Sequence, residues 1–184
     1  MIVDSKKAEK LAVLNLAYGV CAALRTAPKA CGIDHLETAI LTDEDKKKLS
    51  AEMLRIGKGL SEAGDFGDLF VRDAGNVDAS EAVVLVGAKY QARDLGEACS
   101  LCGFKGCAAC AGAGATCVFT PLDLGIALGS AVALVSDNRV DNRIMFTIGK
   151  AAASLGLLGE HKLIMGIPLS VSGKSPFFDR QTAE

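Results

Sequence analysis

The chain has 184 residues, half of them hydrophobic and 23% charged, and its formal net charge at pH 7 is -2. This composition excludes the high-charge, low-hydrophobicity signature of a disordered protein, and the lack of a basic excess argues against nucleic acid as a partner. The length suits a single domain, residues 1–184, that can bury a sizeable core.

Helix and strand patterns alternate from the N-terminus onward. Apolar residues at three- and four-residue spacing predict a helix over residues 5–24, with Ser5 as its cap. The segment 25–32 contains a proline and a glycine but has no apolar period, which indicates a loop. This loop leads into residues 36–41, whose composition is typical of a strand.

The middle of the chain predicts a second helix and two short strands. Thr42 can cap this helix, because three acidic residues follow it and suit the positive end of the helix dipole. Apolar residues then continue at helical spacing as far as Leu60. The runs 69–71 and 82–86 are short and bounded by Gly, Asn or Asp, and the second is rich in valine. Both runs are predicted as buried strands.

Small residues dominate the next predicted helix, over residues 123–135. Glycines lower helix propensity but let a neighbouring backbone approach closely, so we expect a central, tightly packed helix. A further helix is predicted over residues 144–155 and a last strand over residues 162–167. The alternation predicts an α+β or α/β fold, in which helices flank a small central sheet.

The sequence shows no export signal and no long apolar span. The N-terminus lacks a positive start followed by an apolar run and a cleavage site. The longest apolar stretch, residues 124–135, is shorter than the roughly 20 residues of a membrane-spanning helix. We therefore expect a cytoplasmic protein without a membrane anchor. Its seven cysteines would then meet a reducing environment, where clustered thiols more often bind metal than form disulfides.

Five of the seven cysteines fall in one glycine-rich segment, residues 94–120, which we expect to be a cluster-binding loop. Four thiolates hold a [4Fe–4S] cube, and a two-residue gap lets neighbouring cysteines reach adjacent irons. The segment between the first and last of these cysteines carries no charge except that of Lys105. The pattern therefore predicts an iron–sulfur site for electron transfer. The five cysteines are Cys99, Cys102, Cys107, Cys110 and Cys117.

Two other uses of these cysteines compete with a cube. Structural zinc uses the same sulfur ligands but usually joins two cysteine pairs through a longer spacer, and it would make the chain a zinc-stabilised structural or interaction module. Cys107 and Cys110 also have the spacing of a dithiol redox pair, although we expect no helix start after a strand at that place. The iron–sulfur interpretation is favoured over both.

The order Cys99-x2-Cys102-Gly103-x3-Cys107, followed by Cys117, resembles the four-cysteine module of the corrinoid iron–sulfur protein and of a subunit of ion-translocating ferredoxin oxidoreductases. That resemblance implies that these four cysteines bind a [4Fe–4S] cluster. Cys110 departs from the pattern as a fifth thiol that could exchange with one of the four, which leaves open whether Cys117 or Cys110 is the fourth ligand.

The whole chain resembles an uncharacterised prokaryotic family of ferredoxin-domain proteins, through residues 25–29, 123–131, 140–145 and 173–180. The order of its predicted elements is also similar to the layout of FMN-dependent nitroreductases, which are dimers that hold FMN at the subunit interface. This second resemblance implies a possible homodimer and a possible flavin fed with electrons by the cluster. The cations that could then face the flavin phosphate are Arg25, Lys29, Lys174 and Arg180. For the first three, the role of an ordinary surface cation is favoured.

The remaining cysteines and the two histidines carry weaker signals. Cys21 lies on the apolar face of the first predicted helix, where core packing is expected. Cys31 is expected to be an ordinary loop thiol. His35 and His161 stand at strand edges without a ligand spacing, so we expect structural or solvent-facing roles. The electron donor and acceptor are left open.

Overall fold

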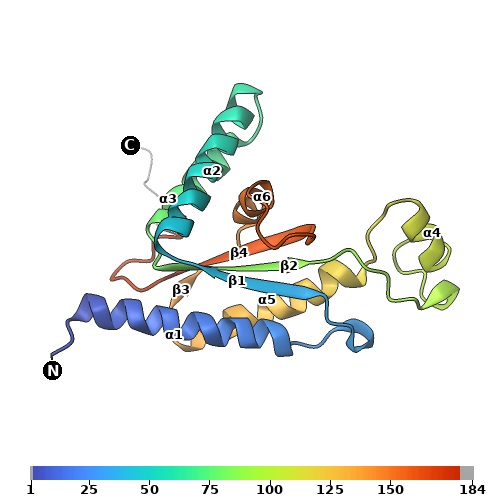
Figure 1. Ribbon diagram of the computed structural model, residues 1–184, viewed down its shortest axis with the longest axis horizontal. Helices are drawn as coiled ribbons and strands as arrows, with labels where there is room; N and C mark the ends of the chain where they lie inside the picture. Colours follow the sequence, from blue (N-terminus) through green and yellow to red (C-terminus); the bar gives the residue numbers. More distant parts are fainter. Residues whose placement is uncertain (1, 179–184) are drawn as a thin grey trace.

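The computed structural model describes residues 2–178 and contains a four-stranded antiparallel sheet with helices on both faces (Figure 1). The strand order is β1-β2-β4-β3. The strands are β1 (Leu36–Leu41), β2 (Ala82–Ala88), β3 (Asp141–Asn142) and β4 (Leu163–Ser170). The helices are α1 (Ser5–Thr26), α2 (Asp43–Glu62), α3 (Gly67–Asp78), α4 (Gly106–Gly112), α5 (Phe119–Asp137) and α6 (Phe146–Ser154), with 3-10 turns η1 (Ala30–Gly32) and η2 (Gly96–Ala98). This arrangement confirms the predicted fold class.

The valine-rich strand β2 lies at the centre of the molecule, and all its residues are buried. Because side chains alternate across a strand, Val84 and Val86 face one core while Val83 and Leu85 face another. The first core is shared with α1 and α5, which lie together on one side of the sheet (Figure 1). The second core is shared with α2, α3 and α6 on the other side. The predicted burial of this strand on both faces is confirmed.

The predicted strand at residues 69–71 is wrong, because these residues belong to helix α3. A three-residue apolar run does not distinguish a strand from a helix. The neighbouring sequence resolves the choice: Phe70, Ala74 and Val77 recur at helical spacing and are all buried. The predicted cap of α1 is also displaced by one residue, since the Asp4 carboxylate accepts the hydrogen bond from the Lys7 backbone N–H at 2.9 Å. Thr42 stands at the N-cap position of α2 but makes no side-chain cap hydrogen bond.

Helix α5 is longer than predicted and less enclosed. A Cβ added at Gly125 or Gly129 would meet no atom within 4 Å, so these glycines do not provide the close backbone approach that we expected. They lie on the solvent side, while Leu124 and Ala131 on the other side reach the core. By length and composition alone α5 is the one helix of the described residues that could cross a membrane. One side of it packs against α1 and the sheet, and 39% of its apolar window is buried.

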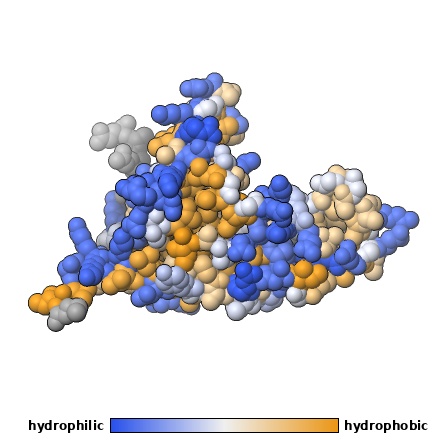
Figure 2. All heavy atoms as spheres, viewed as in Figure 1, coloured by the Kyte–Doolittle hydropathy of each residue, from blue (hydrophilic) through white to orange (hydrophobic). Residues whose placement is uncertain are grey.

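The cysteine-rich segment projects beyond the end of the sheet where β2 finishes (Figure 1). It leaves β2 after Ala88, forms η2 and α4, and returns into α5. Figure 2 shows that the projecting tip is mostly weakly apolar, with hydrophilic atoms at its margin. The segment is therefore placed apart from the two main cores.

Candidate functional site

All five clustered cysteines lie in the projecting segment as free thiols. Cys99 directly follows η2, and Cys102 lies in the turn after it. Cys107 and Cys110 lie on α4, and Cys117 stands two residues before α5. Cys110 is only 4% exposed, whereas the other four are partly buried. The structure thus gathers the thiols that the sequence singled out.

Cys107 and Cys110 occupy a short helix, α4, whose preceding element is the 3-10 turn η2 and not a strand. The preceding strand β2 ends at Ala88, so the strand-to-helix junction of a dithiol oxidoreductase is absent from this part of the described chain. Three-residue spacing on a helix places both thiols on the same face. Cys107 and Cys110 therefore lie together as part of the group of five thiols, without the setting of a dithiol oxidoreductase.

Glycines shape the backbone around the thiols. Gly103, Gly106 and Gly114 have φ values of 82°, 81° and 66°, in the left-handed region that glycine enters without steric strain. A Cβ at Gly106 would also meet the Glu97 backbone nitrogen at 3.2 Å. Gly106 therefore allows the chain entering α4 to lie against the turn that precedes Cys99.

Cys110 is the central thiol of the group. Burial raises the pKa of the Cys110 thiol, and so do a hydrogen bond with Cys102 and the neighbouring thiols of Cys117 and Cys107. Its sulfur also lies 3.6 Å from the Ala115 carbonyl oxygen. Cys99 is not among the groups that act on it. Thiols that oppose one another's ionisation suit a site where a bound cation compensates the thiolates.

The donor set fits an iron–sulfur cluster better than a single ion. A tetrahedral zinc ion with ~2.3 Å bonds draws its four sulfurs to within about 4 Å of one another. Within residues 2–178, no three His, Cys, Asp or Glu side chains converge closely enough to hold one metal ion. A cube is less demanding, because each thiolate binds a different iron. Cys99, Cys102 and Cys107 could hold it together with either Cys117 or Cys110, with the loop adjusting as the cluster binds.

Two cavities adjoin the end of β2 and share Tyr90. One, of about 250 Å³, is lined by Cys110 and Cys117 together with residues 90–92. The other, of about 280 Å³, lies between α6 and the start of β4 and includes Phe146 and two lysines, Lys150 and Lys162. A planar anion in the second cavity would be separated from the thiols by Tyr90 and its neighbours.

A buried polar network lies at the base of the cysteine segment. The Arg93 guanidinium forms an ion pair with the Asp123 carboxylate, with 2.9 Å between Nη2 and Oδ2. The same nitrogen lies 2.9 Å from Nδ1 and 2.8 Å from Nε2 of His35, whose pKa is lowered by burial and by the Arg93 charge. The expected structural role of His35 thus agrees with its burial. Asp123 is visible in the sequence as a lone charge in the apolar run of α5, but nothing there points to Arg93.

Two of the predicted flavin-phosphate cations are engaged within the chain. Lys29 is nearly buried, and its Nζ donates to the carbonyls of Leu24 at 3.0 Å and Ala27 at 2.9 Å, at the C-terminal end of α1. Arg25 pairs with Asp34 and donates to the Leu36 carbonyl at 2.9 Å. The Lys29 contacts satisfy the C-terminal end of α1, and those of Arg25 tie this end to the start of β1.

Lys174, the third predicted cation, does not join them. Lys174 follows β4, whose Leu169 pairs with Ala82 at the start of β2. Arg25 instead contacts Leu36, which pairs with Ala88 at the opposite end of β2. Arg180 lies outside the described residues. Lys174 therefore lies too far from Arg25 and Lys29 to share one phosphate with them within a single chain.

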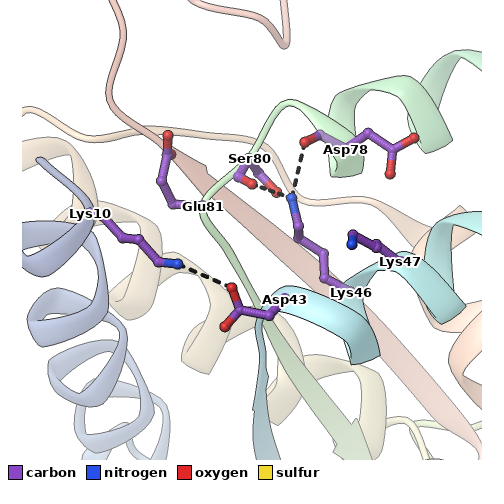
Figure 3. A pocket seen from close by; sticks show the side chains of 7 residues that line it. All are labelled: Lys10, Asp43, Lys46, Lys47, Asp78, Ser80 and Glu81. Atoms are coloured by element: carbon purple, nitrogen blue, oxygen red, sulfur yellow. Dashed lines mark hydrogen bonds and ion pairs between the residues drawn. The ribbon is translucent and has the colours of Figure 1, made fainter. Parts of the chain in front are cut away.

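A cavity of about 410 Å³ lies at the sheet end opposite the cysteines, lined by charged residues of both signs (Figure 3). Lys10 pairs with Asp43 at 3.0 Å. Lys46 donates to the backbone carbonyls of Val77, Asp78 and Ser80, and burial lowers its pKa. Lys46 thereby satisfies the C-terminal end of α3. The charged residues that line this cavity therefore have structural roles where α2 and α3 meet.

The remaining thiols are placed much as expected. Cys21 packs against the core shared by α1 and α5, and burial raises its pKa. Cys31 is exposed in the turn η1.

Comparison with known proteins adds a family and a fold. A family described as "Uncharacterized protein containing a ferredoxin domain (DUF2148)" matches residues 113–180, which include Cys117 but not the other four clustered cysteines. A protein of Archaeoglobus fulgidus, described as an uncharacterized protein, is 39% identical over 188 residues, covering 98% of both chains.

Solved nitroreductases share the fold at low identity. A nitroreductase with bound FMN from Bacteroides fragilis aligns with 100% of this chain and 86% of its own, at a TM-score of 0.59 and 10% identity. One with bound FMN from Desulfitobacterium hafniense aligns with 87% of this chain and 78% of its own, at a TM-score of 0.60 and 13% identity. These likenesses establish a nitroreductase-like fold, and the near full-length archaeal relative together with the matched segment shows that the chain belongs to the family of uncharacterized proteins that contain a ferredoxin domain.

Proposed function

We propose that this chain is an iron–sulfur redox protein that binds a [4Fe–4S] cluster through four of the five cysteines between residues 99 and 117. The observation that carries the proposal is the grouping of free thiols around the buried Cys110, with Cys102, Cys107 and Cys117 acting on it. The ferredoxin domain of the family supports an iron–sulfur redox role. The ligand set implied by the sequence is Cys99, Cys102, Cys107 and Cys117, and Cys110 is its rival member.

The environment suits one-electron transfer. A cluster held by these thiols would supply a one-electron redox couple. The chain's own residues exclude water from Cys110 and surround the site with small apolar side chains and glycine turns. Burial and backbone N–H donors are the features that set the potential of such a site. Because the segment projects from the sheet (Figure 1), a redox partner can approach it without displacing a core element.

The decisive experiment is anaerobic purification with metal and sulfide analysis. We expect brown protein with about four irons and four labile sulfides per chain and visible absorption that bleaches on adding dithionite. The Cys21→Ser variant is the matched control, because Cys21 is a core residue of α1 and should leave the iron content unchanged. Colourless protein that contains stoichiometric zinc would overturn the proposal in favour of a structural module.

A second candidate function is a flavoprotein in which the cluster passes electrons to FMN. It is favoured by the nitroreductase-like fold, since three of the similar structures contain bound FMN. The cavity next to Tyr90, with Lys150 and Lys162, offers aromatic and cationic groups for a planar anion. A phosphate site combining Arg25 and Lys29 with Lys174 would need a homodimer.

The test of the flavin is equilibrium titration of FMN followed by its fluorescence, with light scattering for the molecular mass. Stoichiometric quenching of FMN fluorescence by a dimeric protein would support the flavoprotein function. Unquenched FMN with cluster-loaded protein would leave the chain as an electron carrier.

A further inference from the structure

The ion pair of Arg93 and Asp123 ties together the two ends of the cysteine segment. Arg93 stands six residues before Cys99, and Asp123 stands six residues after Cys117. Their side chains are 0% and 2% exposed, and the pair is joined at 2.9 Å. Buried ion pairs contribute little net stability compared with apolar residues of similar size, so stability alone does not account for this one.

Other groups hold the guanidinium in one orientation. Arg93 Nη1 donates to the Gln91 carbonyl at 2.7 Å, and Nη2 lies against the ring of His35. The second oxygen of Asp123 accepts a hydrogen bond from the Ala30 backbone N–H at 3.0 Å. The pair is therefore anchored to the loop after α1 as well as to both flanks of the cysteine segment.

Two buried donors in this region have no protein acceptor among the described residues. They are Nε of Arg93 and the hydroxyl oxygen of Thr120. The Thr120 backbone N–H donates to the Cys117 carbonyl at 3.0 Å, so Thr120 lies within one turn of a candidate ligand. Gln91, which accepts from Arg93, lines the same cavity as Cys110 and Cys117. Buried donors without acceptors are rare, and sulfur atoms of a cluster are acceptors.

We propose that Arg93, held by Asp123 and His35, is a positioning residue that raises the reduction potential of the cluster. Reduction adds one electron and therefore one negative charge, which a buried cation stabilises. The guanidinium keeps its proton throughout, so no bond is made or broken in the chain. The inference rests on the proposed cluster and specifies how this chain tunes it.

The test is a redox titration of the loaded protein, followed by visible absorption and electron paramagnetic resonance. Arg93→Met removes the cation and should shift the midpoint potential to more negative values. Asp123→Asn removes the compensating anion and should shift it to more positive values. The double variant, R93M/D123N, should lie between the two. Arg55→Met, which removes an exposed cation of α2, is the control and should leave the potential unchanged.

The sign of the shifts in midpoint potential distinguishes an electrostatic effect on the cluster from a purely structural role. Shifts in the same direction, or none, in R93M and D123N would overturn the inference while leaving the proposed cluster intact. Arg93→Lys keeps the charge and should stay nearer the wild-type potential than R93M. If R93K and D123N fold but lose their iron, the Arg93–Asp123 pair serves to hold the cysteine loop in place. That result would also overturn the proposed effect on the reduction potential. Wild-type protein that takes up no cluster would contradict the proposed function itself.

Discussion

Gly149 of α6 lies directly against the backbone of Ile164 in β4. A Cβ built on Gly149 would meet the Ile164 carbonyl oxygen at 1.7 Å and its carbonyl carbon at 2.5 Å. On the strand, a Cβ at Gly166 would in turn meet the Ile148 side chain at 2.0 Å. The helix and strand therefore interlock through two glycines, and this contact holds α6 against the sheet.

Gly149→Ala should destabilise the protein by about 3 kcal/mol, because the added methyl group meets backbone that cannot move aside. Gly129→Ala is the matched control on the open side of α5, where a Cβ meets no atom within 4 Å. It should stabilise the protein by about 1 kcal/mol through helix propensity. Urea unfolding of the metal-free proteins measures both changes. Equal effects at the two positions would contradict the described packing of α6.

Serine variants of the clustered cysteines should distinguish the four cluster ligands from the one cysteine that does not bind the cluster. Cys99→Ser, Cys102→Ser and Cys107→Ser should each lose most of the iron, because these thiols are ligands whether Cys117 or Cys110 is the fourth. Cys117→Ser should also lose it, while Cys110→Ser should retain about four irons per chain if Cys110 is not a ligand. Iron analysis after anaerobic reconstitution measures this. The reverse pattern for Cys117 and Cys110 would make the buried thiol the fourth ligand.

The stability of the metal-free protein should fall as the pH drops below about 6.5, the ordinary pKa of histidine. Burial, and next the Arg93 charge, lower the pKa of His35 in the folded state, although Asp123, Asp34 and the Ile33 carbonyl oppose this. A lowered pKa means that the unfolded chain binds the proton more strongly, so acid favours unfolding. The stability that neutral His35 provides is present above the unfolded-state pKa and is lost as the pH falls through the folded-state pKa.

Thermal unfolding at several pH values between 5 and 8 tests this, with His35→Gln as the comparison variant. The variant should show a flatter dependence over that interval, since its side chain does not titrate. An equally steep dependence would assign the acid sensitivity to carboxylates instead of His35.

Local patterns predicted most of the fold because the two faces of the sheet impose regular burial. The strand around Val84 and the apolar face of α2 followed from periodicity alone. The run at Phe70 was misassigned because three apolar residues carry no period, and only the later Ala74 and Val77 reveal the helix. The small residues of α5 suggested close packing, but the tight contacts lie at Gly149 and Gly166, where tertiary structure brings a helix onto a strand.

The cysteine group was predictable because its members are close in sequence. The network beneath it was not, since Arg93, Asp123 and His35 are far apart along the chain and meet only after the sheet forms. A lone arginine gives no local signal of burial. The central position of Cys110 likewise depends on how α4 folds back toward Cys102, which spacing alone does not determine.

Lys29 provides a test that separates a structural cation from a flavin ligand. Its Nζ donates to carbonyls at the end of α1, and its side chain is only 5% exposed. Lys29→Met should therefore cost about 2 kcal/mol of stability in flavin-free protein, because hydrogen bonds from a charged donor are lost and buried carbonyls are left unsatisfied. Lys58→Met, at an exposed position of α2, should change stability little. Urea unfolding without FMN measures both changes in stability. If K29M protein keeps its stability but binds FMN more weakly, Lys29 belongs to the phosphate site.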